Sequence, residues 1–420
     1  MQKVLIVTYY WPPGSGAGVQ RWLKFSKYLP QYGWEAFILT VDPQFAAYPS
    51  TDRTLEKEIP ESVKVFRTKA TDWFRIYSKD KSKIPSAGFA NNYDNSFKGI
   101  LFRFLRGNFF IPDPRKGWNR FALNKALEII EKEGITRIVT TSPPHSTQLI
   151  GLKIKKKIPD VKWVADFRDP WTDIYYYEQF YPTFISRNVD KWYEKRVLKN
   201  CDKLITVSES LKELLSLKVK GTKLKTEVIT NGFDESDFNE ITAVIPSLFT
   251  ITYVGTLSEA YPIDGLINVL SKVQKLNMHF LLRFVGLVPE NYQKKIGDKL
   301  KADSFEIIPY TIHTEAISYM LNTSVLLLII PDHKSNKAII TGKFFEYLAC
   351  KKPILCLGPE DGDAAEIIAD NGQGKCFSYY DIIKIEKFIL DELAKPTLIS
   401  KNMKNFSHKN LVKKLVSCLQ

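Results

Sequence analysis

Short apolar segments alternate with helical segments along most of this chain. In the first half, the apolar runs do not alternate with polar residues, and stretches with apolar side chains at helical spacing separate them. Strands that are apolar throughout must be buried on both faces, which is typical of parallel sheets covered by helices. The expected strands are residues 4–8, 36–41, 137–141, 162–166 and 203–207. The first half therefore predicts a doubly wound α/β domain.

The second half repeats this alternation, with expected strands at 250–254, 279–285, 304–308, 324–330, 353–357 and 375–377. A chain of 420 residues is too long for one ordinary core and favours two domains of roughly 200 residues each. We expect two Rossmann-like domains that face each other across a cleft. They are residues 1–231, with an insertion at 43–120, and residues 249–380, joined by a linker at 232–248. Helices at 381–420 end the chain, and we expect the last to pack back toward the N-terminal domain.

Composition excludes several classes of protein. The charged fraction of 25% is the average for a globular chain. Five cysteines without a C-x-x-C pair argue against a disulfide framework or a zinc site and favour a reducing compartment. No stretch approaches the roughly 20 apolar residues of a membrane span, and the apolar run at 4–7 is too short for a signal peptide. We therefore expect a cytoplasmic protein.

The net charge of +14 is distributed unevenly. Residues 67–120 hold twelve Lys and Arg against four Asp, with aromatic residues between them. Such a segment suits an anionic membrane surface, which would make the protein peripheral on the inner face of the membrane, or a nucleic acid. A solubilising surface around a substrate entrance explains it equally well. Nucleic acid is disfavoured because the chain has no recognisable recognition motif.

Polar clusters follow three strands of the first domain, at the carboxyl ends where such sheets bind ligands. Gly16 and Gly18 open a helix, where backbone can approach a ligand closely; their spacing is not that of a dinucleotide fingerprint. His145 follows the third strand and could donate to a sugar hydroxyl or a phosphate, or simply cap a helix. Arg168 and Asp169 follow the fourth strand, where a structural ion pair is the alternative.

In the second domain, the run TGKFFEYLA at 341–349 places Lys343 and Glu346 in the first turns of an apolar helix. The start of a helix favours phosphate, and a carboxylate there can accept two ribose hydroxyls. The alternatives are dipole compensation by Glu346 and a lysine that extends along an exposed helix face. Gly255 ends the strand 250–254 and allows close backbone approach at the same sheet edge.

These motifs together resemble the retaining glycosyltransferases of the GT-B fold, a group that includes glycogen synthase, sucrose synthase and bacterial mannosyltransferases. The similar segments are VITNGFD at 228–234, YVGTL at 253–257 and KFFEYLA at 343–349 followed by KPI at 352–354. DFRDPW at 166–171, after SPPH at 142–145, looks like the N-terminal domain of a subset from bacterial surface-polysaccharide clusters.

The resemblance implies a nucleotide-sugar donor, a glycan or lipid-linked acceptor, no metal and no cofactor. It implies that the N-terminal domain binds the acceptor and the C-terminal domain the donor. The donor-binding residues would be Gly16, Gly18, Gly255, Thr256, Lys343 and Glu346, with Glu346 on the ribose and Lys343 on the diphosphate. The catalytic residues would be His145, Arg168 and Asp169, and the acceptor side would include Arg21 and Trp171.

The chain departs from the family pattern at two positions. The first of two glutamates that usually lie eight residues apart falls at Ala338, and the usual arginine of the first C-domain strand is Thr256. Diphosphate binding then depends on Lys343, with Lys334 or Lys337 as further candidates. A nucleotide-sugar 2-epimerase of the same architecture and a non-catalytic binding protein are the alternative functions. The sequence does not name the sugar, the base or the acceptor.

Overall fold

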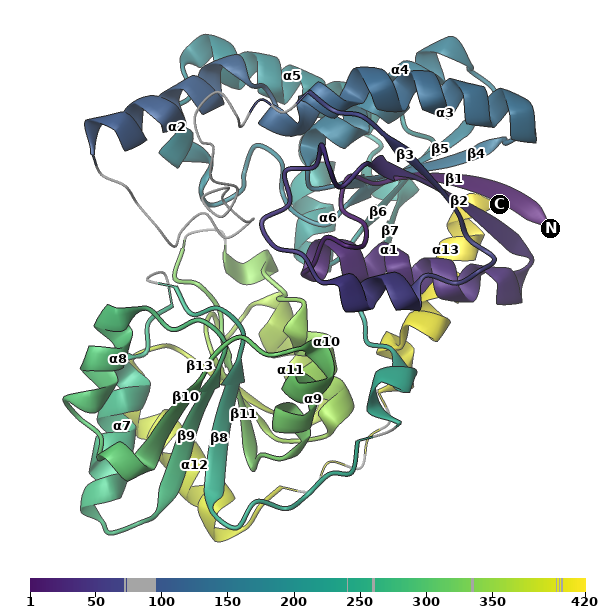
Figure 1. Ribbon diagram of the computed structural model, residues 1–420. Coiled ribbons are helices and arrows are strands. Elements are labelled where there is room, and N and C mark those ends of the chain that lie inside the picture. Colours follow the sequence, from purple (N-terminus) through teal and green to yellow (C-terminus); the bar gives the residue numbers. More distant parts are fainter. Residues whose placement is uncertain are drawn as a thin grey trace. The chain divides into compact units, whose positions relative to one another are not determined.

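The computed structural model describes residues 1–71, 73, 96–239, 241–258, 261–333, 336–397, 399, 401 and 403–420. The chain forms two compact units (Figure 1). The N-terminal unit contains Met1–Asn231 and His408–Gln420, and the C-terminal unit contains Gly232–Ser407. Each unit is built around one parallel sheet, and each is described here by itself.

The sheet of the N-terminal unit has seven parallel strands in the order β3-β2-β1-β4-β5-β6-β7. The strands are β1 Gln2–Val7, β2 Trp34–Val41, β3 Lys64–Thr68, β4 Arg137–Ser142, β5 Lys162–Phe167, β6 Lys203–Thr206 and β7 Thr226–Val228. Strand order reverses between β1 and β4, which makes this a topological switch point where ligands bind in open α/β sheets.

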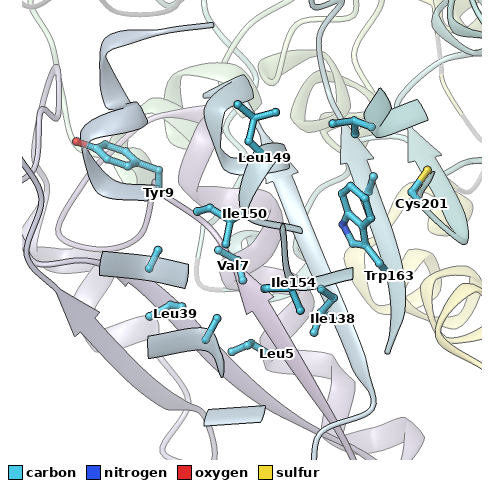
Figure 2. Packing of buried hydrophobic residues seen from close by; sticks show 14 of the residues in the cluster. Leu5, Val7, Tyr9, Leu39, Ile138, Leu149, Ile150, Ile154, Trp163 and Cys201 are labelled. Carbon is cyan, nitrogen blue, oxygen red and sulfur yellow. The ribbon is translucent and has the colours of Figure 1, made fainter. Parts of the chain in front are cut away.

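Helices cover both faces of this sheet: α1 Ala17–Tyr28, α2 Phe97–Phe109, α3 Asn119–Glu133, α4 Gln148–Lys157, α5 Phe184–Asn200, α6 Glu209–Ser216 and α13 His408–Leu419. Alternate strand residues point to opposite faces, so Leu5 and Val7 pack under α3 and α4 (Figure 2). Val4 and Ile6 pack under α1 and α13, the purple and yellow helices of Figure 1.

The C-terminal unit repeats the plan with six parallel strands in the order β10-β9-β8-β11-β12-β13. They are β8 Phe249–Val254, β9 Phe280–Val285, β10 Phe305–Ile308, β11 Val325–Ile329, β12 Ile354–Leu357 and β13 Gly374–Phe377. One face packs on α7 Asp264–Lys275, α8 Glu290–Gly297 and α12 Ile382–Ala394, and the other on α9 His313–Leu321, α10 Lys343–Cys350 and α11 Asp363–Asn371. The switch point lies between β8 and β11.

The predicted fold class, two doubly wound parallel sheets, is confirmed. Local details differ where a residue interrupts a pattern. Apolar residues at helical spacing between Gly18 and Tyr32 predict one helix over this range, but α1 ends at Tyr28. A 3-10 turn at Leu29–Tyr32 follows, because Pro30 lacks a backbone N–H. β3 was not expected inside the 43–120 insertion. This edge strand is only partly buried, so its sequence lacks the continuous apolar run that marks the other strands. Among the described residues, no helix has the length and apolarity needed to cross a membrane.

Candidate functional site

Two glycine turns lie against each other at the carboxyl edge of the C-terminal sheet, beside the switch point. Gly255 follows β8 with φ 124° and Gly286 follows β9 with φ 128°, a region that side chains rarely adopt. A Cβ on Gly286 would lie 2.4 Å from the carbonyl oxygen of Gly255. Both positions therefore require glycine, and bare backbone is exposed to whatever binds at this edge.

Lys343, the first residue of α10, extends over this turn. Its Nζ lies 3.3 Å from the ring centroid of Tyr253 and 3.3 Å from the position that a Cβ on Gly255 would take. Burial lowers the pKa of Lys343 well below its ordinary value. Within the described part of the chain, no carboxylate lies within ion-pair distance of this ammonium group. Desolvation disfavours the charged form of this amine, and a nearby anion would stabilise it, so the position favours an anionic ligand.

Two hydroxyl groups in the neighbouring loops also have no protein partner. Ser258 Oγ follows β8 and Thr341 Oγ1 precedes α10, and both atoms are buried with no hydrogen-bond partner among the described residues. Buried polar atoms are nearly always satisfied, so each exception needs an explanation. A polar ligand held between these loops would provide the missing partners.

Glu346 lies one turn after Lys343 on α10 and contacts a residue that sequence reasoning missed. Its Oε1 is 2.8 Å from Nε2 of His313, and the two side chains are 21% and 26% exposed. His313 is the first residue of α9, which follows β10. The only sequence signal for it was its position at the start of a helix on this edge. The contact orients the carboxylate that was predicted to bind the ribose.

The other residues considered for diphosphate binding at this edge differ in their surroundings. Lys337, a candidate for the diphosphate, forms an ion pair with Asp361. Lys334, the other candidate, lies outside the described residues. Thr256 is exposed, and its carbonyl accepts a hydrogen bond of 3.0 Å from the Tyr253 hydroxyl. Ala338 ends a short 3-10 helix, Asn336–Ala338. Of the predicted basic residues that the structure describes at this edge, Lys343 is therefore the one without a carboxylate partner.

In the N-terminal unit, Arg21 belongs to a buried network. Arg21 and Asp166 are 2% and 0% exposed, and Nε and Nη2 each lie 3.3 Å from a carboxylate oxygen. Arg21 also donates to the carbonyls of Ile229 and Thr230 at 2.9 and 2.7 Å. These contacts join α1, the end of β5 and the segment after β7. The predicted acceptor-side arginine thus forms its hydrogen bonds with groups inside the protein.

Arg168 joins three loops of the same sheet edge. It donates to the carbonyls of Gly18, Ser142 and Pro143 at 3.1 to 3.2 Å. Gly18 and the loop that carries His145 are therefore tied together. Burial raises the pKa of Asp169, and the adjacent Arg168 opposes that shift.

Gly16 precedes α1 with φ 89°, and no atom lies within 4 Å of the position its Cβ would take. The site residues predicted from the sequence therefore form two separate groups. One group lies at the carboxyl edge of the N-terminal sheet and the other at the carboxyl edge of the C-terminal sheet.

His145 and Trp171 line a cavity of about 70 Å³ in the N-terminal unit, together with Tyr10, Arg106, Asp113 and Tyr176 among others. The two rings stack with centroids 5.0 Å apart. Burial lowers the pKa of His145 to about 3, so its imidazole is neutral. Its Nδ1 is buried without a hydrogen-bond partner in the described part of the chain. A ligand hydroxyl that reached this buried nitrogen would supply the missing hydrogen-bond partner.

The described residues contain no group of three or more His, Cys, Asp or Glu side chains arranged to hold a metal ion.

Comparison with solved structures identifies the architecture. A glycosyltransferase from Rickettsia africae ESF-5 is similar over 99% of this chain and 97% of its own, with a TM-score of 0.61 and 16% identity. S. aureus TarM, in a complex that includes UDP, is similar over 100% of both chains, with a TM-score of 0.60 and 12% identity. The fold is GT-B. A putative UDP-N-acetylglucosamine 2-epimerase from Listeria monocytogenes shares it, over 99% of this chain and 95% of its own, with a TM-score of 0.55 and 9% identity.

Residues 85–237 match the model of Glycosyltransferase Family 4. No curated protein sequence matches the chain. The matched segment covers the later part of the N-terminal unit, including His145, Arg168 and Trp171. This family match and the GT-B neighbours support a glycosyltransferase.

Proposed function

We propose that this chain is a retaining glycosyltransferase that moves a sugar from a nucleotide sugar to a lipid-linked glycan in the assembly of a bacterial surface polysaccharide. In this proposal it works in the cytoplasm, at the inner face of the membrane. One observation carries the donor assignment. Lys343 is a desolvated amine without a carboxylate partner among the described residues, and it lies over the glycine turn at the switch point of the C-terminal sheet.

The donor fits this edge by its chemistry. A diphosphate supplies the counter-charge that Lys343 lacks and can accept from the hydroxyls of Ser258 and Thr341. Glu346, oriented by His313, accepts the two ribose hydroxyls. Gly255 and Thr256 offer backbone to the phosphates.

The acceptor is assigned to the cavity of the N-terminal unit, where His145 and Trp171 meet. In a retaining transfer without a protein nucleophile, the bond from the sugar to the leaving phosphate breaks and a bond to the acceptor oxygen forms on the same face. The acceptor proton passes to the leaving phosphate. Catalysis is then mainly positioning and charge stabilisation. His145 and the Arg168–Asp169 pair are proposed to position the reacting groups, and no metal is required.

Calorimetry with UDP, GDP and inorganic pyrophosphate tests the donor site. Lys343→Met should lower the affinity for each of these ligands by at least about tenfold, because a charge-assisted hydrogen bond contributes roughly 1.5–3 kcal/mol. Glu346→Gln should weaken the nucleotides but leave pyrophosphate unchanged, because pyrophosphate has no ribose. Lys272→Met is the matched control, since Lys272 lies near the far end of α7 and pairs with Glu386. Wild-type affinity in Lys343→Met would refute the assignment.

The epimerase alternative shares the fold but is less well supported. It needs acid–base carboxylates, and two of the three that the sequence offers are engaged, Asp166 with Arg21 and Glu346 with His313. Incubation with a nucleotide sugar alone separates the functions, because an epimerase changes the sugar without an acceptor. A binding protein would leave the nucleotide sugar unchanged even when acceptor is present. Transfer that survives a chelator would support the metal-independent mechanism.

A further inference from the structure

Two helices of the N-terminal unit present an apolar outer surface that the described part of the chain leaves exposed. On α2, Phe97, Ile100, Leu101 and Phe104 recur at the spacing of one helix face. These four side chains are between 37% and 81% exposed. Such a stripe normally packs on a core, so its exposure marks an interaction surface.

The first turns of α5 extend this surface. Phe184 and Ile185 are 81% and 75% exposed, and Trp192, two turns later, is 50% exposed. Near the end of the same helix, Val197 and Leu198 are fully buried, so the first turns of α5 differ in leaving large apolar side chains exposed. We call the exposed apolar residues of α2 and α5 the α2–α5 face.

Hydrogen bonds hold the two helices together. Asn108, near the end of α2, donates to the carbonyl of Tyr181 at 3.0 Å. Its side-chain oxygen accepts from the Thr183 backbone N–H and the Ser186 hydroxyl, each at 2.8 Å. Figure 1 shows α2 and α5 close to each other at one end of the N-terminal unit. The exposed residues therefore form one surface.

Basic residues predominate around this face, and the exposed acid Glu178, just before α5, forms an ion pair with Arg187. Every charged residue of α2 is basic: Lys98, Arg103 and Arg106. The two acids of α5 point inward, where Asp190 accepts from the indole of Trp171 and Glu194 pairs with Lys218. They are 4% and 1% exposed. The exposed charges of α5 are all cations: Lys191, Lys195, Arg196 and Lys199.

We propose that the α2–α5 face docks on an anionic lipid bilayer. Its aromatic and aliphatic side chains would enter the boundary between headgroups and acyl chains, and the surrounding cations would meet lipid phosphates. Side chains that protrude, as Phe97 and Phe184 do, suit a deformable lipid phase that needs no complementary pocket. Trp192, with an Arg196 guanidinium 4.6 Å from its ring, has the amphipathic character of an interfacial anchor.

This surface refines the prediction of a membrane contact at 67–120. α2 lies inside that segment and α5 lies far outside it, while residues 72 and 74–95 are outside the described part of the chain. Arg106 and Gly107 of α2 also line the cavity that holds His145. The significance of the docking rests on the proposed function, because it would bring a lipid-linked acceptor to that cavity. The docking itself does not depend on donor binding.

Flotation of the full chain with vesicles tests the proposal, comparing neutral phosphatidylcholine with vesicles that also contain phosphatidylglycerol. We expect binding to the anionic vesicles, stronger at low salt. Phe184→Ser with Ile185→Ser should weaken it by at least about tenfold, and Lys191→Glu with Lys195→Glu should do the same. The control is Leu217→Ser with Leu224→Ser, since these side chains are 85% and 92% exposed but lie on neither helix. It should bind as the wild type does.

The outcomes separate this proposal from the proposed function. Absence of wild-type binding at low salt, or equal binding by all four proteins, would overturn the docking. A wild-type dimer that the Phe184 and Ile185 substitutions make monomeric, without vesicle binding, would assign the face to a second copy and also overturn it. UDP affinity measured on the same variants should not change. Loss of UDP binding in the wild type would instead refute the donor site and leave the vesicle result intact.

Discussion

Replacing Arg21 by methionine gives the sharpest test of what the N-terminal sheet edge does. Asp166 is fully buried and accepts hydrogen bonds from Arg21, from the Trp22 indole at 2.8 Å and from the Thr141 hydroxyl at 2.8 Å. Methionine fills much of the volume of arginine but removes the charge. The substitution therefore leaves a buried carboxylate without its counter-ion.

The expected cost is large. Breaking one side of a buried ion pair typically destabilises a protein by about 3–5 kcal/mol. The carbonyls of Ile229 and Thr230 also lose their donors, at about 1 kcal/mol each. Since the terms share one site, we expect about 4 kcal/mol for Arg21→Met rather than their sum. Arg21→Met combined with Asp166→Asn should recover about 2–3 kcal/mol, because the uncompensated charge is gone.

Tryptophan fluorescence makes the measurement specific. All eight tryptophans lie between residues 11 and 192, in the N-terminal unit. Urea unfolding followed by their emission therefore reports this unit. Gln20→Met, on the same helix, is the control and should change stability by less than about 0.5 kcal/mol. A loss below about 1 kcal/mol for Arg21→Met would refute the structural reading. A stable Arg21→Met variant that no longer binds acceptor would restore the acceptor-side assignment.

Three other substitutions test separate parts of the molecule. Gly151→Ala should destabilise the N-terminal unit by about 1–3 kcal/mol in urea, because its Cβ would lie 2.4 Å from the buried ring of Trp163. Burial raises the pKa of Asp190 to about 7, so the native state holds a proton that the unfolded chain releases near pH 4. The free energy of unfolding of the wild type should therefore fall as pH rises from about 4 to 7. The stability of Asp190→Asn relative to the wild type should increase by about 2–3 kcal/mol as pH rises from about 5 to 8. Parallel stability curves for the two proteins would contradict this prediction. Because burial lowers the pKa of Lys343, the protein should take up a proton when it binds UDP, and its affinity for UDP should fall as pH rises. Calorimetry in buffers of different ionisation enthalpy would detect the proton uptake. Lys343→Met should show neither effect.

The fold could be predicted because its signal is local. Strands that are apolar on both faces indicate a parallel sheet. Turn residues mark the ends of strands, and capping residues mark the starts of helices. Ser208, for example, directly precedes α6 and caps it by accepting a hydrogen bond of 3.2 Å from the Leu211 backbone N–H. The two strands that were missed, β3 and β7, lie at the edges of the sheet. β7 spans three residues and β3 has no fully buried residue, so neither carries the apolar signal.

The site was harder to predict because its decisive contacts are distant in sequence. Glu346 meets His313 across 33 residues, and Arg21 meets Asp166 across 145. The sequence indicated that charges gather where strands end, since that follows from the alternation of strands and helices. Which of those charges neutralise each other depends on how the strands are ordered in the sheet. No local pattern contains that information.

The two sheet edges differ in whether their buried basic side chains have protein partners. In the N-terminal unit, the Arg21 and Arg168 guanidiniums donate to protein oxygens, so these charges hold loops in place. In the C-terminal unit, Lys343 lies among apolar and aromatic atoms without a carboxylate partner in the described part of the chain. Structural charges lower the free energy of the native state through the pairs they form, whereas an unpaired buried charge raises it. Thr256 stands where the family pattern has an arginine, so in the proposed donor site the diphosphate would depend on Lys343 and the glycine backbone, as far as the described residues go. The energetic cost of keeping Lys343 unpaired is the physical reason to expect an anion at this edge.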